Sequence, residues 1–393
     1  MAVLRPENPH QSRLLRLLRD GGPRSRAELG DVVDLSRSKL TAELDRLIEL
    51  GLIRQAGPAA SRGGRPSSMV RISEQIRFLA VDIGISSLEV AITDGELNIL
   101  GCARDATDVR LGPEAVLGLA LELAGKVQAE AGAPQLSGAC FGLPGPVSLR
   151  EGVPVSPPLM PGWHRHPVGD AMSAELGCPV VVENRVNTMA LGEKHAGAAR
   201  SFDDFLFLNF GSGIGCGIVL GGDVYRGVTG CAGDIGHMRV EDGGPVCACG
   251  NTGCLEAVCG STALVREALA AARSNRSEPL ARRLAEAGVL TAADVAEAAT
   301  GDPVALELVR SKARRIGQVL AGLVSFLNPG LVVIAGGVPG IGPTLLAEIR
   351  SAVYQRSTPL ATNNLPIVLS ELGDRAAVVG GARAISDLIF SAD

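Results

Sequence analysis

Aromatic residues are scarce in this chain of 393 residues: they make up 3% of it, and tryptophan occurs once. Long apolar runs are also lacking, because the most apolar window, residues 321–338, is broken by Asn328, Pro329 and several glycines. A helix that spans a membrane needs about 20 mainly apolar residues. The charged start, MAVLRPENPHQSRLLRLLRD, does not fit a signal peptide. We therefore expect a soluble, cytoplasmic protein that makes no membrane contact.

Glycine and apolar residues are abundant instead. Fifty glycines and 46% hydrophobic residues are typical of an α/β protein with many tight strand-to-helix turns, and the length predicts two or three domains. The nine cysteines are an odd number, and disulfides are not expected in a cytosolic chain. A metal site therefore has to be argued from cysteine spacing.

Charge is distributed unevenly along the chain. Residues 1–73 contain 13 Lys and Arg against 8 Asp and Glu, a net charge of +5, and the remaining residues contain 24 against 34, a net charge of −10. A basic segment attached to an acidic body indicates that this segment binds a polyanion.

The basic segment has the pattern of three short helices. SRLLRLLRDGG is an amphipathic helix that ends at Gly21 and Gly22, and Ser25 to Glu28 form a capping box that starts a second helix. The third helix begins at Ser36, where leucines recur at helical spacing. LIRQAG, the turn-rich SRGGRP and SSMVRI follow, which predicts a hairpin wing.

This order of elements resembles a winged helix-turn-helix DNA-binding domain. In that family the third helix enters the major groove, so residues at its start are expected near bases and phosphates, and arginines at the wing tip can reach a phosphate or the minor groove. The expected DNA contacts are Ser36, Arg37, Ser38, Lys39, Thr41, Arg62 and Arg65. The alternative is a small helical docking module whose arginines are only solvated.

Two later segments repeat one plan of strand, glycine turn and strand. Phe78, Asp82 and Gly84 align with Phe205, Asn209 and Gly211 at a constant offset of 127 residues. Paired hairpins of this kind resemble the duplicated halves of the actin, Hsp70 and sugar-kinase superfamily, in which glycine lets backbone amides close on phosphate. LVVIAGGV is similar to that superfamily's adenosine-side turn. Residues expected to retain weak nucleotide binding are Asp82, Gly84, Gly211, Gly213, Gly336 and Gly337. For each turn taken by itself, an ordinary tight turn is the better interpretation, and it is the order and spacing of the three turns together that favour the superfamily.

A cluster of metal-ligand residues follows the second hairpin. GHMRVEDGGPVCACGNTGCLE contains His237, Cys247, Cys249 and Cys254, with a tight Cys-x-Cys-x4-Cys run. One imidazole and three thiolates complete a closed tetrahedral shell, so the spacing predicts a structural zinc site. The alternative is four unligated residues in a glycine-rich loop.

From about residue 78 onward the chain resembles the ROK family of repressors, open reading frames and kinases. The matching motifs are GLPGPV, PPLMPGW, VENRVN, GSGIGCG, GDIGHM, CACGNTGCLE and IAGGV. With the amino-terminal winged helix, the chain resembles the family's transcription regulators. The resemblance implies ligand contacts from Gly145 in the GLPG turn and from Asn184, Asp234, His237 and Glu256. His237 is expected to bind zinc through one nitrogen and to face the sugar with its other side.

Arg185 stands where the family's kinases carry a catalytic aspartate. A general base must accept a proton near neutral pH, and arginine stays protonated, so it cannot act as one. The first glycine turn also departs from the kinase pattern, because Ile85 follows Gly84 and no lysine is present. We expect no catalysis. A guanidinium in the ligand site fits an anionic sugar, and the alternative is that Arg185 pairs with Glu183 or Asp234.

These observations predict a DNA-binding transcriptional regulator, a repressor of carbohydrate metabolism, that responds to a sugar or sugar phosphate in a degenerate kinase cleft. The expected domains are a winged helix-turn-helix over residues 1–75, a first actin-like lobe over 76–200 completed by a helix at about 374–393, and a second lobe over 201–373 with the zinc motif. Expected partners are a double-stranded DNA operator, the sugar effector and a second copy, as homodimer or homotetramer. The alternatives are an ATP-dependent, glucokinase-like sugar kinase that also binds DNA, and a protein-docking scaffold.

Overall fold

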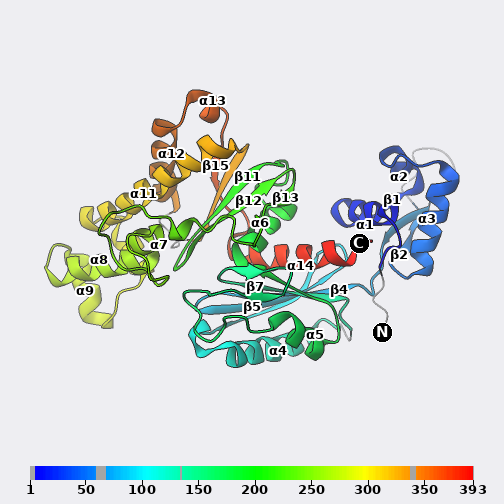
Figure 1. The fold of residues 1–393 in the computed structure, drawn as a ribbon, viewed down its shortest axis with the longest axis horizontal. Helices are drawn as coiled ribbons and strands as arrows, with labels where there is room; N and C mark the ends of the chain where they lie inside the picture. The colour runs from blue at the N-terminus through cyan, green and yellow to red at the C-terminus, as the bar shows by residue number, and fades with distance from the viewer. Residues whose placement is uncertain (1–4, 59–67, 133–134, 337–341, 393) are drawn as a thin grey trace. The chain divides into compact units, whose positions relative to one another are not determined.

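The computed structural model describes residues 5–58, 68–132, 135–336 and 342–392. The chain divides into two compact units: the first combines residues 1–156, 160–195 and 377–393, and the second combines 157–159 and 196–376 (Figure 1). Division of the chain at residues 75 and 200 remains a prediction. Among the described residues, no helix is long and apolar enough to cross a membrane.

The amino-terminal segment has the expected order of helices and a small sheet. Its elements are α1 (Pro9–Gly21), β1 (Arg24–Ser25), α2 (Arg26–Val32), α3 (Arg37–Glu49), β2 (Ile53–Pro58) and β3 (Ser68–Ile72). The strands form an antiparallel sheet in the order β1-β3-β2, with the β2–β3 hairpin as the wing. The predicted capping box at Ser25 and Glu28 is present, and Ser36 caps α3. This order of three helices and an antiparallel hairpin fits the expected winged helix-turn-helix.

The core of this segment continues into the first lobe. Leu14, Leu18 and Leu44 belong to the same cluster of buried side chains as Phe78 and Phe390. At Gly95 a Cβ atom would lie 2.2 Å from Ile72 Cγ2, so the backbone at Gly95 packs directly on β3. The winged helix-turn-helix and the first lobe therefore share one hydrophobic core within the first unit.

The first lobe is built on a five-stranded sheet in the order β10-β7-β4-β5-β6. Its strands are β4 (Arg77–Ile83), β5 (Ser87–Asp94), β6 (Ile99–Ala106), β7 (Gly138–Leu143) and β10 (Val180–Asn184). Strands β4, β7 and β10 are parallel, and β4, β5 and β6 form the antiparallel hairpins. Also present are η1 (Val109–Leu111), β8 (Val147–Ser148), β9 (Val153–Pro154), α4 (Pro113–Glu130), α5 (Val168–Leu176), α6 (Arg185–Ala196) and α14 (Ala376–Ile389).

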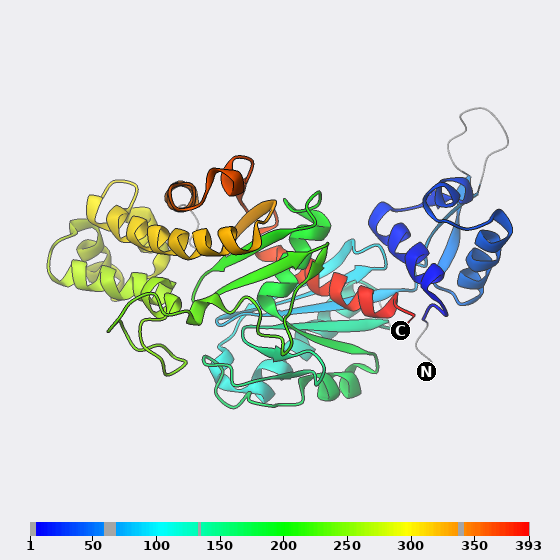
Figure 2. The same ribbon diagram turned by 45° about the horizontal axis from the view of Figure 1, so that its top comes forward.

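Alternation along β4 explains how this sheet is covered on both faces. Leu79 and Val81 pack in the cluster that contains the α4 residues Val116 and Val127, whereas Phe78 packs with α14. Successive side chains of a strand point to opposite faces, so one buried strand supports two layers. Figures 1 and 2 show α14 across one face of the sheet and α4 with α5 on the other.

The second unit repeats the plan with the sheet order β13-β12-β11-β14-β15. Its strands are β11 (Phe205–Phe210), β12 (Ile214–Leu220), β13 (Asp223–Val224), β14 (Leu331–Gly336) and β15 (Ile367–Leu369). Its helices are η2 (Ile235–His237), α7 (Leu255–Cys259), α8 (Ser261–Arg273), α9 (Glu278–Ala287), α10 (Ala292–Ala298), α11 (Pro303–Leu327), α12 (Gly342–Arg356), α13 (Pro359–Thr362) and η3 (Gly373–Arg375). The duplicated, sugar-kinase-like α/β fold is confirmed.

Candidate functional site

The start of α3 presents a polar surface. Arg37, Ser38, Lys39 and Thr41 are exposed, while Leu40 on the opposite face of the helix is buried. Ser36 Oγ accepts from Lys39 N at 3.3 Å, which fixes the first turn of the helix. The other two expected DNA contacts, Arg62 and Arg65, lie outside the described residues.

One neighbour of this surface was missed by the sequence reasoning. His10, at the start of α1, has its Nε2 atom 3.2 Å from Lys39 Nζ. It sits in the first turn of a different helix, so helical periodicity within α3 gives no sign of it. The signal that points to it is its place in the basic segment, next to the helix cap at Asn8.

Arg185 forms a two-point ion pair with Asp82. Its Nε atom lies 2.7 Å from Asp82 Oδ1 and its Nη2 atom 2.9 Å from Oδ2. Asp82 is thus a partner of Arg185 that was not among the carboxylates considered from the sequence, Glu183 and Asp234. The parallel strands explain the pairing: Asp82 in β4 and Glu183 in β10 lie on either side of Gly142 in β7, so Arg185 at the end of β10 reaches β4 across a residue without a side chain.

Glu183 is held by the turn into α6. Its Oε1 atom accepts from Asn184 N at 2.9 Å and from Asn187 Nδ2 at 3.0 Å, and its side chain is buried. Asn184 in turn donates through Nδ2 to the Gly145 carbonyl oxygen at 2.7 Å, while its Oδ1 atom accepts from Val186 N. The structure thus brings Gly145 and Asn184 together at the end of β10, beside Arg185.

The first glycine turn is closed by its own backbone. Gly84 N donates to Ser87 O at 2.7 Å, and a Cβ atom at Gly84 would meet Ser87 Oγ at 2.8 Å. Ile85 packs against the core of the first lobe. This turn is therefore shaped by its own backbone hydrogen bond and by the packing of Ile85.

The corresponding turn in the second unit lies against Glu256. Gly211 N donates to Gly213 O at 3.1 Å, and Glu256 Oε2 accepts from Ile214 N at 3.0 Å. A Cβ atom at Gly236 would lie 2.3 Å from Ile214 O, so glycine is required where this loop crosses β12. Gly336 ends β14 with a φ of 72°, and Gly337 lies outside the described residues.

Two carboxyl groups of the second unit face His237. Asp234 Oδ1 lies 3.9 Å from His237 Nε2. Partial burial raises the pKa of Asp234, whose side chain is still 41% exposed, and His237 opposes this shift. Burial also raises the pKa of Glu256, against the hydrogen bond from Ile214 N and the nearby His237. Carboxyl groups next to an imidazole are suited to hydrogen bonding with the hydroxyls of a ligand.

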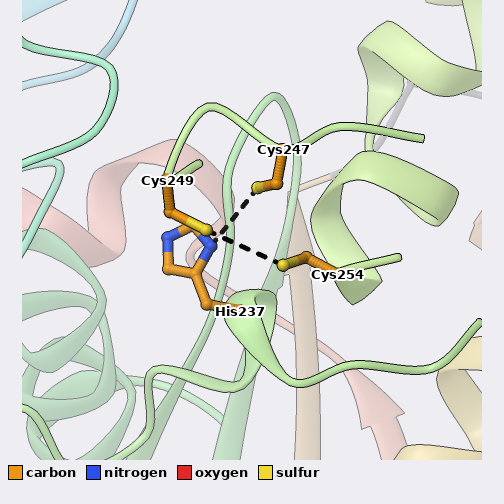
Figure 3. A group of neighbouring side chains, drawn as sticks. All are labelled: His237, Cys247, Cys249 and Cys254. Atoms are coloured by element: carbon orange, nitrogen blue, oxygen red, sulfur yellow. Dashed lines mark hydrogen bonds between the residues drawn. The ribbon is translucent and has the colours of Figure 1, made fainter. Parts of the chain in front are cut away.

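The four expected metal ligands meet at one point. The candidate ligand atoms of His237, Cys247, Cys249 and Cys254 all lie within 4.8 Å of one another. His237 Nδ1 is 3.5 Å from Cys247 Sγ, and Cys249 Sγ is 3.7 Å from Cys254 Sγ (Figure 3). Because Nε2 faces Asp234, the imidazole turns one nitrogen to the thiols and the other to a carboxylate.

The backbone of the loop explains why the thiols converge. Cys247 N donates to Asn251 O at 2.7 Å, and Gly250 N donates to Cys247 O, which closes a tight turn around Cys249. Gly253 has a φ of 70°, and a Cβ atom there would lie 1.8 Å from Glu241 O. A set of one imidazole and three thiols fits a structural zinc ion and leaves no coordination position open.

The family model of the ROK family matches residues 78–387. A putative xylose repressor from Caldicellulosiruptor sp. (strain Rt8B.4) is 29% identical, over 97% of this chain and 96% of the relative. A glucokinase from Halalkalibacterium halodurans is 37% identical, over 63% of this chain and 75% of that enzyme.

Solved structures give the same relationship. A ROK family transcriptional regulator, described as a homolog of the E. coli MLC protein, superposes with a TM-score of 0.82 at 26% identity and covers 97% of this chain and 96% of its own. A ROK family glucokinase from Streptomyces griseus, solved with glucose and AMPPNP, has a TM-score of 0.70 at 30% identity and covers 78% of this chain and 98% of its own. The chain belongs to the ROK family.

Proposed function

We propose that this protein is a transcriptional repressor that binds an operator through its winged helix-turn-helix and responds to a sugar without phosphorylating it. The observation that carries this proposal is the ion pair between Arg185 and Asp82. Arg185 is a permanent cation at the position where we expect the base of a kinase. The Asp82 carboxylate near the end of β4 is bound by this arginine. The similarity to repressors supports the proposal, because it extends over 97% of the chain, whereas the two glucokinases described above cover 63% and 78%.

The ion pair also favours a neutral effector. Arg185 already directs Nε and Nη2 at Asp82, and the pair carries no net charge, so it offers little attraction to a phosphate or sugar acid. Proposed effector contacts are Gly145, Asn184, Asp234, His237 and Glu256, whose amide, carbonyl and carboxyl groups suit vicinal hydroxyls. Stabilisation of the protein by glucose 6-phosphate in a thermal-shift series, without stabilisation by glucose or xylose, would contradict this choice.

Zinc is proposed as the resident metal of the His237, Cys247, Cys249 and Cys254 cluster, where it would tie the loop that carries His237 to the start of α7. The ion would hold the imidazole in one orientation toward Asp234. We also propose a homodimer or homotetramer, since paired winged helices read paired half-sites on DNA.

DNA binding is tested by incubating the full-length protein with sheared genomic DNA from its source and sequencing the recovered fragments. The proposal predicts enrichment at a few palindromic sites, and the double variant Arg37→Ala, Lys39→Ala should lose it. Arg282→Ala is the matched control, because Arg282 is an exposed arginine on α9 in the second unit. Equal recovery by the wild-type protein and the double variant would contradict specific binding through α3.

The second candidate is an ATP-dependent sugar kinase that also binds DNA. Retention of Asp82 and of the Gly211 to Gly213 turn favours it, as does the identity to a glucokinase. ADP formation that depends on glucose or xylose, and that His237→Ala abolishes, would establish this candidate. The sensor proposal expects no such ADP.

A further inference from the structure

Helix α6 extends from the proposed effector contacts to the winged helix-turn-helix. It begins at Arg185, directly after Asn184, whose side chain holds both Gly145 O and Val186 N. It ends at Ala196, and His195 Nδ1 in its last turn lies 3.7 Å from Asp20 Oδ1 of α1. A helix of 12 residues is roughly 18 Å long, so a single rigid element joins the two places.

The far end of α6 meets a cluster of ionised side chains from α1 and α14. Arg19 Nη1 donates to Asp387 Oδ1 at 2.6 Å and to Ser386 Oγ at 3.1 Å, and Arg19 Nε donates to Asp20 Oδ1 at 2.8 Å. Arg383 lies 2.9 Å from Asp387 Oδ2 and 3.4 Å from Asp20 Oδ1. We call Arg19, Asp20, His195, Arg383 and Asp387 the Arg19 cluster.

The Arg19 cluster is balanced and tightly bound. It sets two guanidinium groups against two carboxylates, and the Arg19 side chain is fully buried. A buried cation is stable only while its carboxylates and hydrogen-bond partners stay in place. A small displacement of α1 relative to α14 would therefore disrupt several bonds at once, which favours a small number of discrete arrangements over a continuous range.

Helix α6 also contacts α14 without any side chain between the two backbones. A Cβ atom at Gly380 would lie 1.6 Å from Thr188 O and 2.6 Å from Gly192 N. The backbones of the two helices are in direct contact at this crossing. Because a protein interior is closely packed, a displacement of one helix here pushes on the other. A shift of α6 thus reaches α1 directly at His195 and also through α14 at Asp387 and Arg383.

We infer that α6 and the Arg19 cluster transmit occupation of the effector site to the winged helix-turn-helix. The biological meaning of this inference rests on the proposed function. The mechanical link does not, since it concerns contacts within the first unit and can be measured without sugar or operator.

The test is hydrogen–deuterium exchange on the full-length protein, read in peptides that cover residues 9–21. Asn184→Ala removes the side chain that joins Gly145 to the start of α6. We expect amide exchange in residues 9–21 to become severalfold faster, and we expect His195→Gln in the same chain to reduce that response. Arg282→Ala, on the exposed face of α9, should leave residues 9–21 unchanged. Faster exchange in residues 180–196 with unchanged exchange in residues 9–21 would overturn the inference.

A second perturbation covers the case in which Asn184→Ala leaves residues 180–196 unaffected. Gly380→Ala forces a methyl group against Thr188 O and must displace α6 or α14. We expect altered exchange in residues 9–21, and unchanged exchange there in a chain with native circular dichroism would overturn the inference.

Operator binding provides a readout that does not depend on Gly380→Ala folding. In His195→Gln, the sugar-induced change in operator Kd should fall to less than half of its wild-type value. An unaltered sugar response would count against the link. A failure to find any operator would count against the proposed function and leave the exchange result to stand by itself.

Discussion

Arg185 and Asp82 are joined by two hydrogen bonds, of 2.7 and 2.9 Å, at the carboxyl ends of the parallel strands β10 and β4. Asp82 is 4% exposed and Arg185 17%, so the pair is largely shielded from water. In this fold the ends of neighbouring parallel strands are where ligands are commonly bound. The pair therefore neutralises the Asp82 carboxylate with an internal counterion at this end of the sheet.

Breaking this pair from one side should destabilise the protein. Arg185→Met leaves the Asp82 carboxylate buried without its partner, and such a loss costs about 3–5 kcal/mol. Asp82→Asn in the same chain removes the stranded charge and should restore most of the stability. Urea unfolding of the two single variants and the double variant measures this. If the two losses simply add, the pair is not coupled in the folded protein.

Operator affinity should depend on salt through the start of α3. Each of Arg37→Ala and Lys39→Ala removes one exposed cation and should lower the slope of log K against log salt by about 1 if that residue contacts a phosphate. Fluorescence anisotropy with a recovered operator fragment, at several salt concentrations, measures the slope. If Arg37→Ala and Lys39→Ala have the same slope as the Arg282→Ala control, neither Arg37 nor Lys39 contacts a phosphate.

The purified protein should contain one zinc ion per chain. Cys249→Ser removes a thiolate of the cluster and should lower both the zinc content and the melting temperature, as should a strong chelator. Cys231→Ser is the matched control, because Cys231 is an exposed cysteine of the same unit and lies outside the cluster. Elemental analysis with thermal unfolding is the measurement. Equal zinc content in the two variants would exclude the proposed ligand set.

Stability should fall with acid in a way that depends on His195. Burial and the neighbouring Arg383 lower its pKa to about 4 from an ordinary value of 6.5; Arg19 acts in the same direction, whereas Asp20 and Asp387 oppose the shift. The unfolded chain then takes up the proton first as the pH falls. The neutral imidazole's contribution is complete above pH 6.5 and is lost progressively toward pH 4, by up to about 3 kcal/mol.

The matched variant for this pH effect is His195→Gln, which cannot titrate. The gap between the melting temperatures of wild type and variant should move in the variant's favour between pH 7 and pH 5, while carboxylates far from residue 195 affect both chains equally. A gap that stays constant over this range would show that His195 does not take up the proton on unfolding.

Local features of the fold were predictable because their signals lie close together in the sequence. The capping box of Ser25 and Glu28 spans four residues, and the Cys247 to Cys254 run spans eight. In both patterns only a few residues separate the interacting side chains, so the backbone holds them close together. Both groups of residues meet in the structure. The alternation along β4 likewise follows from the two-residue period of a strand.

Long-range partners were not predictable. The alternative considered from the sequence for Arg185, an ion pair with Glu183 or Asp234, did not include Asp82, which lies 103 residues away and is brought near by the strand order. Arg19 and Asp387 are separated by 368 residues, and no periodicity links them. The core shared by the winged helix-turn-helix and the first lobe was not predictable for the same reason. The spacing of the leucines in α1 indicates a buried face but does not indicate which segment covers it.

Coupling between sugar and operator is measured by the Kd of the recovered operator with and without the sugar that stabilises the protein in thermal shift. For a sugar-responsive repressor we expect a change of about 5-fold to 100-fold in Kd, with no ADP formed when ATP is present. An operator Kd that the bound sugar leaves unchanged would contradict this expectation.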